Sequence, residues 1–119
     1  MKIKLLCAVL ALIFIASGSA KLAGLEFELQ AFERWGYPLG FMYFIGVIEV
    51  LGGVALLLPR LSALAGGCLA LMMIGAVATH VIHAEWPMFV AASLILIFSA
   101  LRAWLGRSQI CALIGRRAP

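Results

Sequence analysis

Glu49 is the side chain whose type and position raise the first chemical question in this chain. It lies near the middle of an apolar run from Leu39 to Leu58. As a helix, that run of about 20 residues would be roughly 30 Å long, which matches the hydrocarbon core of a bilayer. A carboxylate at that depth is costly and usually faces protein or water, where it finds a partner. We therefore expect Glu49 to face other helices rather than lipid.

Lys21 is the nearest candidate partner for this carboxylate. If Leu5 and Leu58 mark the same membrane surface, Lys21 lies roughly 10 Å further across the bilayer than Glu49. That gap exceeds a direct contact, but a long lysine stem or a water can shorten it. Ser17 lies one helical turn before Lys21 and could bridge the two charges.

Two further polar side chains, Tyr43 and His80, are expected on the same outward side of the membrane as Lys21. Together these groups would form a polar funnel that opens outward and closes near Glu49. The candidate ligand-binding residues are Lys21, Tyr43, Glu49 and His80. The alternative is that Lys21 and Glu49 form an internal salt bridge that only fixes the helix register.

A complete catalytic or metal site is not expected. His80, His83 and Glu85 could suggest zinc, but two histidines and one carboxylate at a membrane border are a weak signal, because a zinc site needs convergent ligands of fixed geometry. The three cysteines include no Cys-x-x-Cys pair, which argues against thiol–disulfide chemistry within the chain. We expect no metal and a chain that is not catalytic on its own.

The composition indicates an integral membrane protein. Hydrophobic residues make up 66% of the 119 residues, charged residues 12%, and the mean hydropathy is +1.16. Soluble domains are about half apolar, so a soluble fold is excluded. The net charge of +4 does not indicate nucleic-acid binding, because the basic residues lie between and beyond the apolar runs rather than in a stripe with aromatics. The expected surroundings are a lipid bilayer.

The apolar runs predict an all-α, transmembrane four-helix bundle that forms a single domain over residues 1–119. The expected spans are about 4–23, 39–58, 61–82 and 87–105, followed by a cytoplasmic tail at 106–119. The link at Pro59 and Arg60 is so short that the second and third spans must be antiparallel neighbours. Small residues let membrane helices approach closely. The glycines expected at such contacts are Gly46, Gly53, Gly66 and Gly75.

The first apolar run can be interpreted in two ways. Lys2 and Lys4 precede it and a small-residue cluster at 17–20 ends it, as in a secretory signal peptide. We prefer a retained first helix, because cleavage would remove the partner that Glu49 needs.

The segment between the first two spans predicts an amphipathic interfacial helix. Leu25, Leu29 and Phe32 share one helical face, while charged residues such as Glu33 gather on another. We prefer a membrane-surface anchor as its role. The alternative is a lid over a cavity between the spans.

The basic residues also predict the orientation of the chain. Of the nine lysines and arginines, only Lys21 and Arg34 fall on the side that holds the interfacial helix and Glu85. Basic residues concentrate on the cytoplasmic side of membrane proteins. We therefore expect a bacterial-type inner membrane protein with both termini in the cytoplasm.

Four short motifs give the chain a family resemblance. They are Gly18-Ser19-Ala20-Lys21-Leu22, Trp35-Gly36-Tyr37-Pro38, Gly46-Val47-Ile48-Glu49-Val50-Leu51-Gly52-Gly53 and Gly75-Ala76-Val77-Ala78-Thr79-His80. In order and spacing they resemble the DoxX-like membrane proteins, over nearly the whole chain up to Arg102. The resemblance implies a four-helix bundle. It also implies a redox association, since the family's namesake is a small subunit of an archaeal quinone-linked thiosulfate oxidoreductase.

Three hypotheses of function follow. The first is a redox-associated accessory subunit that holds a quinone or another flat apolar molecule in the funnel, next to a redox enzyme subunit or a second copy of the chain. The second is a small exporter that uses Glu49; the small multidrug-resistance exporters carry their glutamate in the first span, whereas Glu49 is in the second. The third is a purely structural membrane partner.

Overall fold

The computed structural model describes residues 2–113 of the chain. The helices are α1 (Lys2–Leu22), α2 (Glu26–Trp35), α3 (Leu39–Leu56), α4 (Ser62–Ile82), α5 (Trp86–Leu105) and α6 (Arg107–Leu113). Within this part of the chain, α1, α3, α4 and α5 are long and apolar enough to cross a membrane. The prediction of an all-α, transmembrane four-helix bundle with an amphipathic helix between the first two spans is confirmed.

Local sequence signals explain where the helices end. Gly36 has a φ of 82° and donates its backbone N–H to α2 carbonyls, a left-handed cap that suits glycine. Pro38 then stands immediately before α3, where no amide donor is needed. Pro59 lies in the short turn between α3 and α4, and Pro87 lies in the first turn of α5. Each of these three prolines therefore falls where it breaks no helical hydrogen bond.

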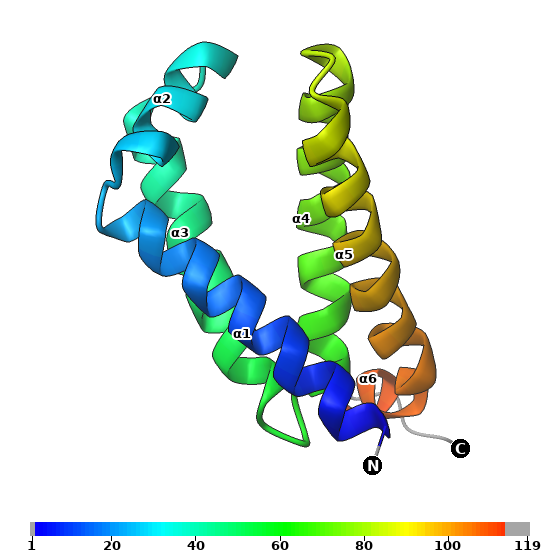
Figure 1. Cartoon of the computed structure of the whole chain (residues 1–119). Coiled ribbons are helices and arrows are strands. Elements are labelled where there is room, and N and C mark those ends of the chain that lie inside the picture. Colours follow the sequence, from blue (N-terminus) through cyan, green and yellow to red (C-terminus); the bar gives the residue numbers. More distant parts are fainter. Residues whose placement is uncertain (1, 114–119) are drawn as a thin grey trace.

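The four long helices form two pairs. α1 packs mainly against α3, and α4 packs mainly against α5. The pairs converge at the end that holds the first turn of α1 and α6, which we call the terminal end, and they diverge towards α2 (Figure 1). The buried core lies where the pairs converge and towards the middle. Its members are Leu10, Ala11, Phe14, Leu56, Ala65, Leu69, Met73 and Ala92.

Glycines permit the close approach within each pair. A Cβ atom on Gly18 would lie 2.6 Å from the backbone oxygen of Gly46, and one on Gly66 would lie 2.9 Å from the backbone oxygen of Ser99. A Cβ on Gly53 would lie 2.7 Å from Ile15. Gly75 differs from the expectation, because no atom lies within 4 Å of a Cβ placed there. The reason is that Gly75 faces a cavity rather than a helix.

The outer surface of the bundle is apolar. Large side chains such as Leu12, Leu71 and Ile82 are more than two-thirds exposed. A soluble protein rarely shows such continuous apolar surface, whereas a lipid-facing surface requires it.

Candidate functional site

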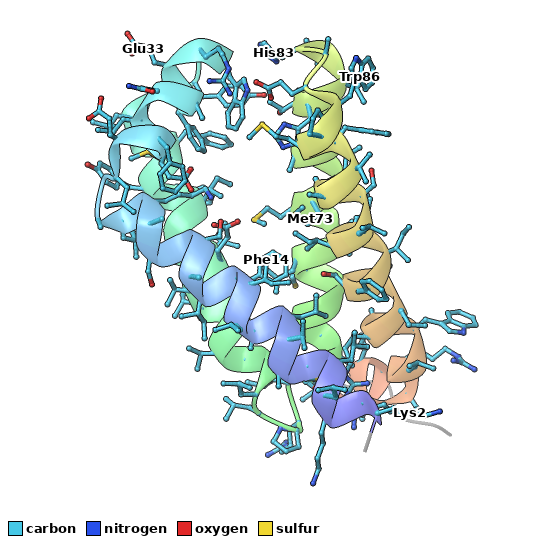
Figure 2. The ribbon with its side chains drawn as sticks, in the orientation of Figure 1. Lys2, Phe14, Glu33, Met73, His83 and Trp86 are labelled. Atoms are coloured by element: carbon cyan, nitrogen blue, oxygen red, sulfur yellow. The ribbon has the colours of Figure 1, made fainter. Side chains whose placement is uncertain are left out.

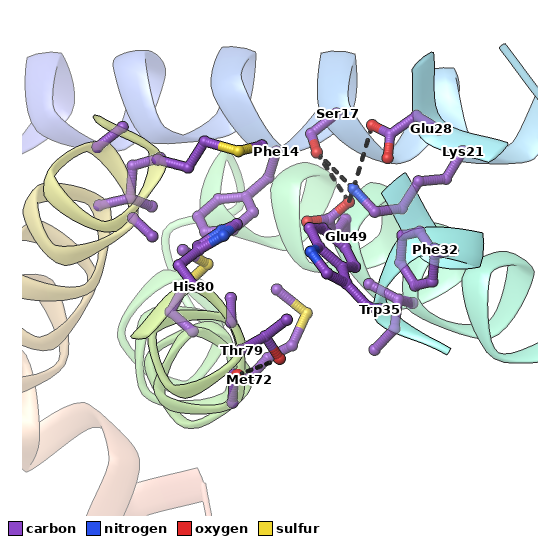
Figure 3. Close-up of a pocket in the computed structure, with 18 of the residues that line it drawn as sticks. Phe14, Ser17, Lys21, Glu28, Phe32, Trp35, Glu49, Met72, Thr79 and His80 are labelled. Atoms are coloured by element: carbon purple, nitrogen blue, oxygen red, sulfur yellow. Dashed lines mark hydrogen bonds and ion pairs between the residues drawn. The ribbon is translucent and has the colours of Figure 1, made fainter. Parts of the chain in front are cut away.

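Lys21 and Glu49 form a buried ion pair between α1 and α3. Lys21 Nζ lies 2.9 Å from a carboxylate oxygen of Glu49, and both side chains are at least nine-tenths buried. Ser17 links the same two groups, because its hydroxyl accepts from Lys21 Nζ at 2.8 Å and donates to Glu49 at 3.0 Å. Figure 3 shows the three side chains meeting between the helices. Neither charge is left alone in the apolar interior, which is the arrangement that a low-dielectric site requires.

The direction of the side chains explains why the contact is direct. A helical Cα–Cβ bond tilts towards the helix N-terminus. Because α1 and α3 run in opposite directions, Lys21 leans towards the terminal end and Glu49 leans towards α2. The lysine stem spans the remaining distance, down to the level of Ser17. The axial offset estimated from the sequence is therefore closed by side chains, without a bridging water.

Glu28 is a third charged member of this cluster that sequence reasoning missed. One of its carboxylate oxygens lies 3.5 Å from Lys21 Nζ, and its side chain is 11% exposed. The signal was present in the sequence, because Glu28 lies three residues after Leu25 and four before Phe32, on the apolar face of α2. Two carboxylates thus share one ammonium group.

A cavity of about 400 Å³ lies beside this cluster, between the two helix pairs at the α2 end. Phe14 from α1 and Met73 from α4 both reach into the space between the pairs (Figure 2). α2 contributes to its wall, which agrees with the lid alternative for this helix. Aromatic and sulfur-bearing side chains form a large part of the wall, and they are Phe14, Phe27, Phe32, Trp35, Tyr37, Phe41, Met72, Met73 and Met88.

Contacts from the α2 segment to the end of α4 close the cavity across the gap between the pairs. Arg34 Nη2 lies 2.7 Å from Glu85, and the Trp35 indole N–H donates to the same carboxylate at 3.0 Å. The Tyr37 hydroxyl lies 2.7 Å from the Thr79 hydroxyl. We call these interactions, of Arg34 and Trp35 with Glu85 and of Tyr37 with Thr79, the closing contacts. They join segments about fifty residues apart in the sequence.

Glu85 is the centre of the closing contacts. Burial of its carboxyl would raise its pKa, but hydrogen bonds from His80, Arg34 and Trp35 and the charge of Arg34 outweigh burial and lower the pKa to about 2. The carboxylate therefore stays ionised at any physiological pH. Small changes of pH near neutrality therefore leave the charge of Glu85, and with it the closing contacts, unchanged.

His80 presents a ring nitrogen to the cavity. Its Nδ1 lies 2.9 Å from Glu85, and because a carboxylate only accepts, Nδ1 carries the hydrogen. The structure shows no partner for Nε2 within residues 2–113. His80 is buried and lines the cavity, with its ring edge-on to Trp35 at 5.5 Å. His83 instead directs Nδ1 to the Thr79 carbonyl, so it does not join His80 and Glu85.

Of the residues expected from the sequence, Lys21, Glu49 and His80 line the same cavity. Tyr43 does not, and it is 38% exposed on another face of α3. The helical period explains the difference, because Phe41, Ile45 and Glu49 recur at intervals of four residues, whereas Tyr43 falls between them. Tyr37, which precedes α3, takes the place in the cavity that Tyr43 was expected to hold.

Replacing Glu85 by glutamine tests the closing contacts. Because the folded-state pKa is below the ordinary 4.5, the stabilisation from the Glu85 charge is complete above pH 4.5 and is lost as the pH falls towards 2. We expect Glu85→Gln to lower the free energy of unfolding in detergent by about 2 kcal/mol at pH 7. The difference from the parent protein should shrink below pH 4.5.

The control is Glu33→Gln, which removes an exposed carboxylate from α2, the helix that carries Arg34 and Trp35. It should leave stability unchanged across the pH range. An effect of Glu85→Gln that is as large at pH 3 as at pH 7 would contradict the assigned role of the charge.

The chain resembles known proteins along most of its length. Residues 5–102 match the model of the DoxX-like family. A Bacillus subtilis (strain 168) protein named "Putative oxidoreductase CatD" is 29% identical over 109 residues, which cover 92% of this chain and 81% of that protein. "Uncharacterized protein YdgD" of the same strain is 29% identical over 86 residues, which cover 69% of this chain and 75% of that protein. No solved structure matches the chain.

The family match spans nearly all of the four long helices and every residue that lines the cavity. The resemblance inferred from the four motifs is thereby confirmed. This chain is a membrane protein that belongs to the DoxX-like family.

Proposed function

We propose that the cavity binds a quinone-like molecule, meaning a flat apolar ring with polar oxygens, and that the chain acts as an accessory subunit of a redox enzyme. The observation that carries this proposal is the composition of the cavity: about 400 Å³ enclosed by aromatic and methionine side chains, with a few polar groups aimed inward. Ligand sites for small apolar molecules have this character. Aromatic walls favour a planar ring, because ring faces and edges can stack against it.

The polar groups suit the two oxygens of such a ring. The three N–H groups of Lys21 serve Ser17, Glu49 and Glu28, and a ligand carbonyl oxygen could accept from Lys21 by replacing the longest of these contacts, the one to Glu28 at 3.5 Å. On the opposite side, the Thr79 hydroxyl donates to the Gly75 carbonyl, so the Tyr37 hydroxyl donates to Thr79. The Tyr37 oxygen is then left as an acceptor for a quinol hydroxyl.

His80 adds a group that can exchange a proton with the ligand. With Nδ1 held by Glu85, Nε2 keeps a lone pair that can accept from a ligand hydroxyl. Oxidation of a quinol to a quinone releases two protons and two electrons. His80 can take up one proton and the second passes to water at the mouth of the cavity, while both electrons pass to a redox partner protein, which is why we propose an accessory role. The family membership and the printed name of the relative CatD support a redox association.

The exporter hypothesis has less support. An exporter of cations needs a carboxylate that its substrate can reach, and Glu49 is already neutralised by Lys21 and hydrogen-bonded by Ser17. The structural-partner hypothesis predicts no saturable ligand and is therefore separated from ours by a binding experiment.

A photoreactive benzoquinone with a short isoprenoid tail tests the proposal on the purified chain in nanodiscs. We expect saturable labelling that unlabelled quinone competes away and that maps to residues lining the cavity. Ala76→Phe, on the cavity wall, should weaken binding at least about tenfold, because the ring would occupy the ligand's space.

Ala78→Phe is the matched control, since Ala78 is on the same helix but is exposed and does not line the cavity. It should bind like the parent protein. Labelling confined to the terminal end, or no saturable labelling, would contradict the proposal and favour a structural role.

We also propose that the chain lies in the inner membrane of a bacterial-type cell with both termini in the cytoplasm. The distribution of basic residues supports this orientation. Seven of the nine lysines and arginines, Lys2 and Lys4 among them, are expected on the side of the membrane opposite α2, and basic residues concentrate on the cytoplasmic side. The cavity would then open towards the outer side. Reporter fusions after Arg34, Arg60, Glu85 and Pro119 should read outside, inside, outside and inside. A cytoplasmic signal after Arg34 would contradict this orientation.

A further inference from the structure

Arg102 is a buried cation at the terminal end, far from the cavity described above. It lies in the last turn of α5 and is 4% exposed. Its guanidinium donates to the Ser62 hydroxyl from Nε at 3.2 Å and from Nη2 at 2.7 Å, and Nη2 also lies 3.3 Å from the Gln109 side-chain oxygen. These partners are neutral. The structure shows no hydrogen bond from Nη1 within residues 2–113.

No acidic side chain of this chain can neutralise Arg102. The five glutamates are residues 26, 28, 33, 49 and 85, and the chain has no aspartate. Glu28 and Glu49 are paired with Lys21, and Glu85 is paired with Arg34. A buried charge without a counter-ion is costly, and arginine remains charged at any pH that a cell meets. Within residues 2–113 no negative charge pairs with Arg102, so an anion from outside the chain can supply the missing charge.

The surroundings of Arg102 provide space for an anion. A second cavity, of about 560 Å³, lies at the terminal end and is lined by Arg102, Ser62 and Gln109. Lys4, from the first turn of α1, adds a second positive charge to its wall. Ser62 is also the first residue of α4, whose N-terminal dipole end favours negative charge.

Apolar side chains form a large part of the remaining wall of this cavity. Ile3, Leu57 and Leu105 line it, and all three are exposed on the outside of the bundle. An anion that carries hydrocarbon can therefore place its charge against Arg102 and its chain along these residues. The guanidinium group matches phosphate in geometry as well as charge.

We propose that this second cavity is a binding site for a phosphate-bearing anion, with Arg102 as the principal ligand and Lys4 and Ser62 as supporting groups. The same phosphate chemistry is offered by the headgroup of an anionic phospholipid and by free phosphate, and the apolar walls favour the lipid. The site is independent of the quinone-type ligand proposed for the α2 end.

Thermal unfolding of the full chain in detergent micelles tests this proposal in three media. These contain added phosphatidylcholine, added phosphatidylglycerol with the same acyl chains, or phosphatidylcholine with inorganic phosphate at constant ionic strength. A bound anion stabilises the folded state, so phosphatidylglycerol should raise the melting temperature by roughly 4–8 °C over phosphatidylcholine. Stabilisation by inorganic phosphate to the same extent would identify free phosphate as the source.

Three variants separate this site from general charge attraction. Arg102→Met should lose most of the stabilisation, and Lys4→Gln should reduce it. Arg107→Met is the matched control, because Arg107 lies at the same end but is exposed and stacks on Trp104 at 4.0 Å. It should keep the full effect.

Lys4 is exposed, so Lys4→Gln keeps the test decisive if Arg102→Met fails to fold. Equal melting temperatures in all three media would overturn the proposal. So would an effect that survives in Lys4→Gln and Arg102→Met, or one that falls equally in Arg107→Met.

Discussion

The buried ion pair between Lys21 and Glu49 is the interaction on which the rest of this structure depends. Both charges lie at least nine-tenths buried inside helices that face lipid on their other sides, so each needs the other. The close approach of Gly18 to Gly46 brings α1 and α3 within reach. Side-chain tilt and the lysine stem complete the contact. The pair therefore fixes the register of these two helices.

The same cluster determines where the cavity lies. Glu28 brings α2 against Lys21, which places Phe32 and Trp35 over the space between the helix pairs. The core packs fully only where the pairs converge, so the space between them at the α2 end stays open to a ligand. Glu85 then joins the two sides across that space, through Arg34 and Trp35. Each end of the bundle thus has its own polar chemistry: charge pairs at the α2 end, and an unneutralised Arg102 at the terminal end.

Much of the fold could be predicted from the sequence, because the governing constraint is simple. Apolar runs of bilayer length, ended by prolines and charges, predict membrane helices whatever their packing. The role of Glu49 followed from the cost of a carboxylate in lipid, and the amphipathic α2 followed from its helical period. These arguments need only neighbours in the sequence.

The contacts across the gap could not be predicted in that way. Glu85 meets Arg34 from 51 residues away, and nothing in either local pattern indicates this partner. Depth in the membrane alone indicates Tyr43, but the face of α3 turns it away from the cavity, which Tyr37 lines instead. Gly75 could not be placed from the sequence either, because a small residue that lines a cavity and one at a helix contact look alike in the sequence. Glu28 could have been found, because a carboxylate on an apolar helical face indicates a buried partner.

A double-mutant cycle on Lys21 and Glu49 tests the central claim most directly. Unfolding free energies would be measured in detergent micelles for the parent chain, Lys21→Met, Glu49→Leu and the double variant. Lys21→Met leaves the buried Glu49 carboxylate without a counter-ion and should cost about 3–5 kcal/mol. Glu49→Leu leaves Lys21 with the longer contact to Glu28 and should cost less, while the double variant should recover much of the loss. Single-variant losses that simply add in the double variant, with coupling below about 0.5 kcal/mol, would contradict the claim that this ion pair organises the bundle.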